Sequence, residues 1–180
     1  SGFAICAIVS TPSWVCLPFW LAYGVFYASG SDARWHECGH ATAFKTPWMN
    51  RLVYQIACFM IIRNPVTWRW SHARHHTDTL LIGRDAEIAV MAPPAVLRII
   101  LNFIGLPDII DSFRRMTGHI FGYIQPDEAL YTPTHEQKKI VVVARIWGLV
   151  YFLVLASAIY YQSVVPLLLI GGPRIYGSWH

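Results

Sequence analysis

The hydrophobic and polar positions divide this chain of 180 residues into two apolar ends and a polar middle. Residues 1–31 and 146–173 contain no Asp, Glu, Lys or Arg, whereas all ten acidic residues lie between Asp32 and Lys139. A transmembrane helix needs about 20 predominantly apolar residues, and the run Ile140–Tyr160 has this length. The pattern therefore predicts membrane-spanning segments on both sides of one water-facing region.

Each apolar end is expected to form a transmembrane hairpin, the first over residues 1–29 and the second over residues 140–179. In the first, Gly2–Val9 is too short to cross a bilayer alone, and Pro12 separates it from the longer apolar run Ser13–Ser29. In the second, a short uncharged turn separates the spanning run from an apolar return segment. Aromatic side chains in both ends suit the interface between lipid and water.

Residues 30–139 are predicted to be a helical region that lies in the cytosol or against the membrane surface. The apolar segments Arg51–Ile62 and Met91–Leu106 are too short, or too often interrupted by proline, to cross. Pro107–Lys139 is predicted to be a polar connection, because its Pro-Asp pairs favour turns. The expected fold class is all-α: an integral-membrane helical bundle of two transmembrane hairpins around a cytosolic or interfacial histidine-bearing region. Because the chain opens in an apolar run and not at a methionine, we expect a single membrane-embedded domain, 1–180, that is truncated at both ends.

Composition and charge favour a membrane protein and argue against a nucleic-acid-binding one. Hydrophobic residues make up 55% of the chain and charged residues 13%, which is about half the charged share of soluble domains. The net charge is +4 without a run of Lys and Arg, and a cationic cytoplasmic membrane face explains this better than a nucleic-acid partner. The four cysteines have no framework spacing and are expected to be reduced.

Five of the eight histidines form two clusters with the spacing of metal ligands. The first, HECGH, begins at His36 and ends at His40; the second, HARHH, contains His72, His75 and His76. On a helix, residues three or four apart lie on the same face, so each cluster is expected to present its imidazoles on one side. Imidazole clusters presented from two helices are typical of a transition-metal site.

The first cluster leaves an alternative open. HECGH also matches the H-E-x-x-H motif of zinc metalloproteases, in which two histidines bind Zn²⁺ and the glutamate, here Glu37, is the general base. A membrane zinc protease needs one further ligand and does not explain the three histidines of the second cluster. Two clusters that act together account for all five histidines.

The two clusters, HECGH and then HARHH, resemble the first two histidine boxes of membrane fatty acid desaturases. The stretch after the second box, from Arg84 to Glu87, is similar to the same region in many bacterial members. That family has a third box, H-x-x-H-H, after a further transmembrane hairpin, and no such motif occurs before the last residue, His180. We therefore expect the remaining metal ligands to lie downstream, with His180 as a candidate additional ligand.

The resemblance implies a di-iron centre with O2 as co-substrate. Its implied ligands in this sequence are His36, His40, His72, His75 and His76. Two reduced iron ions would activate O2 to remove hydrogen from an unactivated C–H bond of a fatty acyl chain, which makes the expected activity desaturation. Because five histidines do not complete two iron sites, these 180 residues by themselves are expected to be inactive.

Three carboxylates are candidates for orienting the ligand imidazoles through hydrogen bonds: Glu37, Asp85 and Glu87. Their alternative role is ordinary surface ion pairing with Arg34, Arg74 or Arg84. His119 and His135 lie in the polar connection without box spacing. We therefore expect them to be solvent-exposed or to contact the metal ligands without binding the metal themselves.

The resemblance also implies partners. These are a fatty acyl substrate carried as a lipid, acyl-CoA or acyl-carrier protein, the membrane lipid itself, and an electron donor such as ferredoxin or cytochrome b5. An acidic donor would suit the basic side chains of the polar region, although cytoplasmic topology alone explains them too: Arg63, Arg69, Arg74, Lys138 and Lys139. We expect an integral, multi-pass membrane protein with its histidine boxes on the cytoplasmic side. Related di-iron hydroxylases and ketolases that act on a lipid or hydrocarbon are the alternative within this chemistry.

Overall fold

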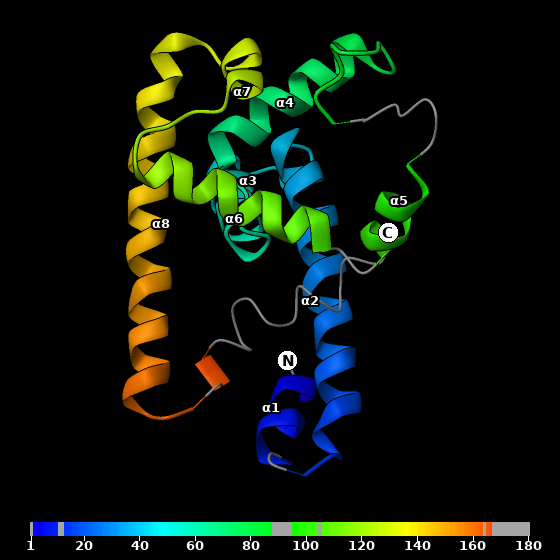
Figure 1. Ribbon diagram of the computed structural model, residues 1–180, viewed down its shortest axis with the longest axis vertical. Coiled ribbons are helices and arrows are strands. Elements are labelled where there is room, and N and C mark those ends of the chain that lie inside the picture. Colours follow the sequence, from blue (N-terminus) through cyan, green and yellow to red (C-terminus); the bar gives the residue numbers. More distant parts are fainter. Residues whose placement is uncertain (1, 11–12, 88–94, 104–105, 164, 167–180) are drawn as a thin grey trace.

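The structure is a computed structural model that describes residues 2–10, 13–87, 95–103, 106–163 and 165–166. Every regular element in these residues is a helix, which confirms the predicted all-α class (Figure 1). The helices of the described residues are α1 (Gly2–Val9), α2 (Cys16–Gly39), α3 (Pro47–Met60), α4 (Pro65–Asp78), α5 (Val96–Phe103), α6 (Leu106–Ile120), α7 (Pro126–Tyr131) and α8 (Thr134–Tyr160).

α2 joins the first apolar run to the first histidine cluster in one continuous helix of 24 residues. No proline follows Pro18 within it, so the helix continues through residue 29 without a break. α1 lies beside the apolar half of α2, where the rings of Phe3 and Phe26 stack at a centroid distance of 5.6 Å (Figure 1). The turn at Pro12 lies outside the described residues, so the first hairpin stays a prediction. The histidines at the end of α2 are thus carried on a direct extension of an apolar helix.

α8 is the one helix, among the residues that the structure describes, that is long and apolar enough to cross a membrane. It has 27 residues, and 11% of its apolar stretch is buried inside the protein. It begins six residues before the predicted run, at Thr134 rather than Ile140, because its polar first turns are also helical. The return segment after Pro166 lies outside the described residues, so the second hairpin also stays a prediction.

A short turn between α3 and α4 fixes the second histidine helix against α8. The side chain of Asn64 caps α4 by accepting a hydrogen bond from the N–H of Val66 at 3.1 Å. Its amide nitrogen donates to the carbonyl oxygen of Ile140 at 3.0 Å. Pro65 occupies the first position of α4, where a missing N–H is tolerated. One residue therefore both starts the helix and attaches it to the membrane-spanning candidate.

The polar connection predicted before α8 is largely helical, which corrects the expected turns at its prolines. Pro107 and Pro126 lie in the first turns of α6 and α7, where proline's fixed φ favours a helix. α6 ends in a Schellman motif, in which Gly122 takes a φ of 85° and the N–H of Tyr123 donates to the carbonyl oxygen of Gly118 at 2.8 Å. The chain can then reverse direction into α7.

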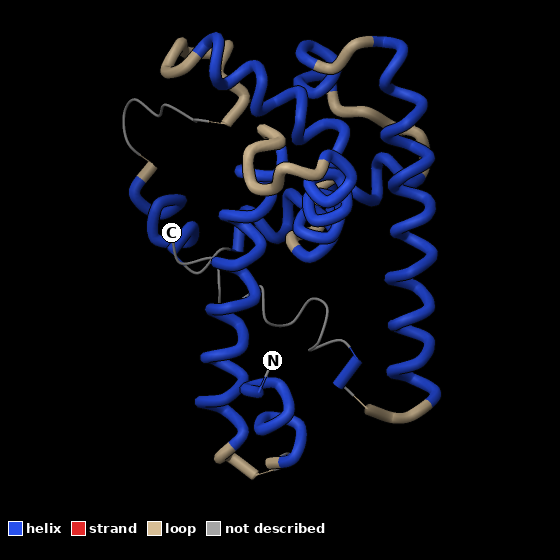
Figure 2. Tube along the Cα trace, turned by 180° about the vertical axis from the view of Figure 1, so that it is seen from behind, coloured by secondary structure: helices blue, strands red, loops and turns tan. Residues whose placement is uncertain are grey.

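The buried core lies where α2, α3, α6 and α8 meet. Its members are Trp35, Cys38, Tyr54, Ala57, Cys58, Ile61, Ile62, Met116, Ala144 and Trp147. Seen from behind in Figure 2, α2 and α8 run along opposite sides, with α3, α4 and α6 between them. Trp68 of α4 packs against this core, so burial of apolar side chains, which stabilises by about 25 cal/mol per Å², fixes the end of α2 relative to α4. These are the two helices that carry the histidine clusters.

Candidate metal centre

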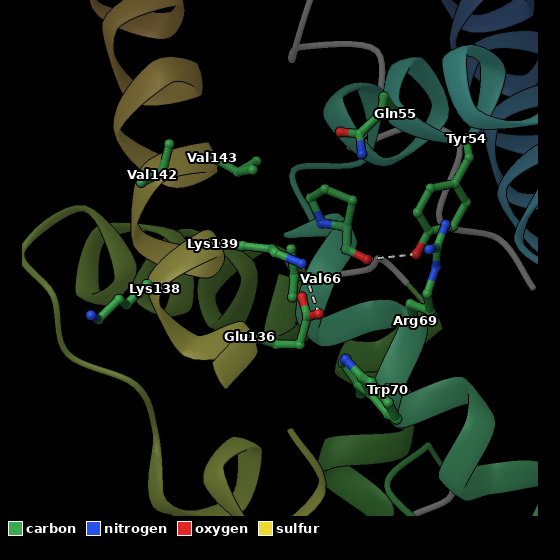
Figure 3. Close-up of a pocket in the computed structure, with 11 residues that line it drawn as sticks. Tyr54, Gln55, Val66, Arg69, Trp70, Glu136, Lys138, Lys139, Val142 and Val143 are labelled. Carbon is green, nitrogen blue, oxygen red and sulfur yellow. Dashed lines mark hydrogen bonds and ion pairs between the residues drawn. The ribbon is translucent and has the colours of Figure 1, made fainter. Parts of the chain in front are cut away.

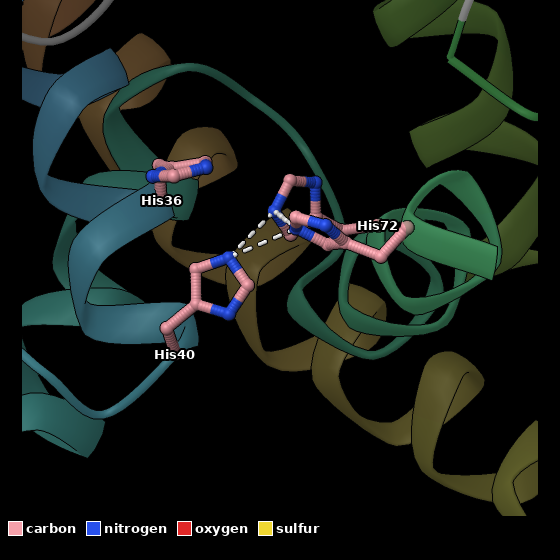
Figure 4. Close-up of side chains that lie close together, drawn as sticks. His36, His40 and His72 are labelled. Carbon is pink, nitrogen blue, oxygen red and sulfur yellow. Dashed lines mark hydrogen bonds between the residues drawn. The ribbon is translucent and has the colours of Figure 1, made fainter. Parts of the chain in front are cut away.

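The two histidine clusters meet at the ends of two helices. His36 lies in the last turn of α2 and His40 is its C-cap, while His72 and His76 lie one turn apart on α4 (Figure 4). One ring nitrogen from each of these four side chains lies within 4.8 Å of the others. The structure thus brings together four of the five predicted ligands from two separate parts of the sequence.

Three of the four imidazoles aim their Nε2 atoms at one common point. The Nε2···Nε2 distances are 3.0 Å from His40 to His72, 3.1 Å from His40 to His76, and 3.1 Å from His72 to His76. A hydrogen bond joins one protonated nitrogen to one lone pair, so at most two of these three contacts can be hydrogen bonds. A cation between the three nitrogens satisfies all of their lone pairs at once.

The spacing of the three nitrogens fits a metal ion with ligands at right angles. With metal–nitrogen bonds of about 2.1 Å, ligands at right angles lie about 3.0 Å apart and tetrahedral ligands about 3.4 Å apart. The observed 3.0–3.1 Å lets one ion contact all three nitrogens. Imidazole is a good ligand for iron as well as for zinc, copper and nickel, so the donor set is compatible with iron.

Carboxylates hold the other ring nitrogen of His72 and of His75. Nδ1 of His72 lies 3.0 Å from a carboxylate oxygen of Glu87, and Nδ1 of His75 lies 3.0 Å from one of Asp85. A proton on Nδ1 leaves Nε2 with the lone pair that a metal needs. The side chains of Glu87 and Asp85 are 16% and 2% exposed. Both acids thus bind imidazoles.

Glu37 binds His36 in the same way, but in an exposed setting. Its Oε1 lies 3.0 Å from Nδ1 of His36, and its Oε2 accepts a hydrogen bond from the hydroxyl of Thr42 at 3.2 Å. These two hydrogen bonds, first that of His36, lower the pKa of Glu37. Each oxygen of the Glu37 carboxylate therefore already has a hydrogen-bond partner, and one of these partners is Nδ1 of His36. A zinc protease needs this glutamate on the metal side as general base, so the arrangement argues against that alternative.

A tight turn after α4 brings the carboxylates of Asp85 and Glu87 back to the histidines of that helix. Leu80 and Gly83 take positive φ values of 62° and 76° in this turn. The carboxylate of Asp85 accepts hydrogen bonds from the N–H groups of Leu80 and Glu87, both at 2.9 Å. Asp85 therefore fixes the conformation of the turn as well as the orientation of His75.

His75 lies apart from the group of four. Its ring centroid is 6.0 Å from that of His72 and 5.8 Å from that of His76. Because Asp85 holds its Nδ1, its Nε2 keeps a lone pair. The structure therefore offers this fifth imidazole to a different point in space from the one shared by His40, His72 and His76.

Trp35 is a residue of the site that the sequence did not single out. Its ring meets the ring of His72 edge-on, at a centroid distance of 5.0 Å, and meets that of Trp68 at 4.7 Å. It is 7% exposed, so it forms a fixed apolar wall between α2 and α4. Its adjacency to His36 was a signal, but adjacency does not reveal a partner on another helix.

Burial lowers the pKa of His40, and the neighbouring imidazoles of His72, His36 and His76 lower it further. Metal ions bind the neutral imidazole, so a lowered pKa keeps this ligand ready to bind. The cluster is not sealed, since His40 and His76 are exposed while His72 is buried. The open side leaves room for further ligands.

The other histidines have different surroundings. His180 lies outside the described residues. The side chain of His135 is 75% exposed, which agrees with the expectation. His119 was expected to be exposed or to contact the metal ligands without binding the metal; it is instead 1% exposed, with Nε2 2.8 Å from a carboxylate oxygen of Glu128. Its place on α6, beneath α7, explains the difference, because the expectation assumed a polar connection without helices.

An all-helical chain with a membrane-spanning candidate and a cluster of imidazoles at the ends of its helices defines a class, namely helical membrane proteins with a histidine-rich metal centre. Comparison with protein families gives the particular one. The family described as fatty acid desaturase matches residues 12–180. The chain belongs to the fatty acid desaturase family.

Relatives of known activity are similar over part of their length. The chain is 34% identical over 101 residues to an sn-1 oleoyl-lipid 12-desaturase of Synechocystis sp., covering 52% of this chain and 28% of that protein. It is 34% identical over 74 residues to an sn-1 acyl-lipid omega-3 desaturase (ferredoxin) of Nostoc sp., covering 41% and 20%. It is 25% identical over 180 residues to the acyl-lipid omega-3 desaturase (cytochrome b5) of the endoplasmic reticulum of Arabidopsis thaliana, covering 94% and 46%. The chain therefore spans less than half the length of each of these relatives, and no solved structure matches it.

Proposed function

We propose that this chain carries part of the catalytic centre of an O2-dependent, di-iron acyl-lipid desaturase. The observation that supports this most strongly is the triangle of Nε2 atoms, with edges of 3.0–3.1 Å, formed by His40, His72 and His76. Its spacing and its nitrogen ligands suit iron. The relatives named above are desaturases of acyl lipids, which favours desaturation over the hydroxylase and ketolase alternatives.

In this proposal the five imidazoles serve two ions. His36, His40, His72 and His76 hold one ion, because their nitrogens lie together, and His75 is a ligand of the second. Two ferrous ions held there would supply the activation of O2 that removes hydrogen from an unactivated C–H bond. The remaining ligands lie outside the described residues, where His180 is a candidate.

The carboxylates and Trp35 are proposed to prepare these ligands. Glu87, Asp85 and Glu37 each hold a proton on Nδ1 of one imidazole, so that the opposite nitrogen is free for the metal. The ring of Trp35 packs against His72 and limits its rotation. An oriented ligand set retains its geometry when the iron changes its charge, which a redox centre requires.

Substrate, donor and membrane setting follow from the same proposal. The acyl chain is carried by a membrane glycerolipid, as the names of the relatives indicate for those proteins. Electrons come from an external carrier such as ferredoxin or cytochrome b5, the donors named for two relatives. The protein crosses the membrane several times, and its histidines lie on the cytoplasmic side, where Lys and Arg are enriched.

The test is production of the full-length protein in a host that makes monounsaturated but no polyunsaturated acyl lipids. We expect one acyl chain of the host glycerolipids to lose two hydrogens, detected by mass spectrometry. The product should disappear in His75→Ala and persist in His135→Ala, since His135 is exposed and away from the cluster. An acyl chain that gains oxygen would favour the hydroxylase alternative, and equal product from both variants would contradict the proposed role of His75.

A further inference from the structure

A groove between α3, α4 and the start of α8 has a volume of about 500 Å³ (Figure 3). Its character changes along α8: Lys138 and Lys139 line its polar end, and Val142 and Val143 line its apolar end one turn further on. The apolar end continues along the membrane-spanning candidate. Lysines in the first turns of such a helix lie at the depth of lipid headgroups. If α8 crosses the membrane, the groove spans the boundary between headgroups and acyl chains.

The polar end of the groove carries excess positive charge. The amine of Lys139 reaches over the groove and binds the carboxylate of Glu136 at 2.8 Å, while the amine of Lys138 points away from it (Figure 3). Arg69 is an exposed residue, and its guanidinium lies 5.2 Å from the centre of the Tyr54 ring. Within the described residues no carboxylate lies within ion-pairing distance of Arg69. One anionic group fits this charge.

The neighbouring arginines show that Arg69 differs from them. Arg63 is bound to Asp108 at 2.6 Å, and Arg74 is bound to Asp78. Both are therefore neutralised by partners within the chain. Arg69 keeps its charge available beside a groove whose far end is apolar, which is the combination that recognises an anionic lipid headgroup.

The groove adjoins the histidine cluster through two residues. Tyr54 and Arg69 line the groove, and they also line a smaller cavity of about 130 Å³ that reaches His40 and His72. The hydroxyl of Tyr54 donates to the carbonyl oxygen of Pro65 at 2.8 Å, so its ring is fixed. Arg69 lies on the exposed side of this wall, with its guanidinium beside the Tyr54 ring.

We propose that the groove binds a glycerolipid with an anionic headgroup, held by Arg69 and Lys139, and that its acyl chain reaches the histidines past Tyr54. The binding site stands on the charge and shape of the groove, while the identification of the lipid as substrate rests on the proposed desaturase function. Binding of the headgroup draws Arg69 toward the anion and away from Tyr54. The same interaction that selects the lipid thereby opens the wall between the groove and the cavity beside His40.

The test is native mass spectrometry of the full-length protein in detergent, with dioleoylphosphatidylglycerol and dioleoylphosphatidylcholine added in equal amounts. We expect wild type to retain the anionic lipid preferentially. Arg69→Gln should reduce its binding by about fivefold to tenfold, and Lys139→Gln should reduce it less, because Glu136 already pairs with that amine. Arg69→Lys should retain most of the preference. Lys45→Gln, which removes an exposed charge outside the groove, should leave it unchanged.

Two outcomes would overturn the inference. One is equal binding of the two lipids to wild type, or an unchanged preference in Arg69→Gln. The other is displacement of the lipid by free glycerol phosphate, which would show that a soluble phosphate and not a lipid is the ligand. Iron measured on the same samples separates this test from the proposed function. Lipid preference without iron would remove the desaturase proposal and keep the lipid site, whereas iron without lipid preference would do the reverse.

Discussion

Two histidine–glutamate pairs in this protein, His72 with Glu87 and His119 with Glu128, share their chemistry and differ in their surroundings. The nitrogen–oxygen distances are 3.0 Å and 2.8 Å. In the first pair, the free nitrogen of His72 lies 3.0–3.1 Å from the nitrogens of two other imidazoles. In the second pair, the free nitrogen of His119 is buried and has no hydrogen-bond partner in the part of the chain described.

The acid also differs between the two pairs. Glu128 accepts a further hydrogen bond from the N–H of Gln125 at 3.0 Å and lies 3.4 Å from a guanidinium nitrogen of Arg115. The side chain of Glu128, which is 2% exposed, therefore caps the start of α7 and also binds α6 through His119. A carboxylate on one ring nitrogen is thus common to both places. What distinguishes the candidate metal centre is that several imidazoles turn their other nitrogens to one point.

The largest expected effect on stability follows from breaking the buried pair of α6 and α7. Glu128→Ala leaves His119 and Arg115 without their buried carboxylate, and removing one partner of a buried ion pair costs about 3–5 kcal/mol. Thermal unfolding in detergent, followed by thiol labelling, measures this effect. Cys58 suits that readout because it is fully buried and burial raises its pKa to about 12.

The matched control for this variant is Asp127→Ala. Asp127 binds Arg115 at 2.8 Å, but its side chain is 56% exposed, so its loss should cost at most about 1 kcal/mol. Iron per folded protein should be unchanged in both variants. Equal destabilisation by the two substitutions would contradict the structural role given to the His119–Glu128 pair.

An intermediate effect, on iron affinity, is expected when a carboxylate that hydrogen-bonds to a proposed ligand histidine is replaced by an amide. Glu87→Gln should weaken iron binding by about 10-fold to 100-fold, the usual cost of losing such a partner. Glu37→Gln should weaken it less, because Glu37 is 58% exposed and water can replace it, whereas Glu87 is 16% exposed. Competition between the purified full-length protein and an iron chelator gives both values. The burial argument fails if Glu37→Gln has the larger effect.

The smallest expected effects concern two residues with positive φ, one directly after α6 and one directly after α2. Gly122, after α6, has a φ of 85°, and Ala41, after α2 and His40, has a φ of 60°. A side chain at positive φ costs about 1–2 kcal/mol, which glycine avoids. Gly122→Ala should therefore lower the free energy of unfolding, and Ala41→Gly should raise it, each by about 1 kcal/mol. No atom lies within 4 Å of a Cβ placed at Gly122, so the first change tests the backbone alone. Shifts of the same sign in the thiol-labelling assay would contradict this explanation.

The histidine spacing predicted only part of how the imidazoles group in space. Residues four apart share a helix face, so the pairing of His72 with His76 was predictable. A helix turns about 100° per residue, so His75 and His76 lie on opposite sides of the line through His72, and only His76 shares its point of contact. The proposal of orienting carboxylates agrees with the observed contacts of Asp85 and Glu87. The sequence alone did not decide between these contacts and arginine pairs, because a turn with positive φ at Gly83 brings the acids back.

The fold was predictable where the pattern was local and less so where it depended on tertiary contacts. The apolar run of α8 indicated a helix directly. α6 and α7 were missed because Pro107 and Pro126 were interpreted as turns, although proline also begins helices. The motif from Gln125 to Glu128 is a capping box that signals the start of α7. Its second role, binding His119 on α6, has no local signature.

The measurement that tests the metal centre most directly is the iron content of the full-length protein purified in detergent. Wild type is compared with His72→Ala, His75→Ala and His119→Gln. We predict about two iron ions per wild-type chain, the number that the proposed di-iron centre requires, with losses in the first two variants and none in the third. One zinc ion per chain, retained in both His72→Ala and His75→Ala, would contradict the di-iron proposal and return HECGH to the zinc-protease alternative.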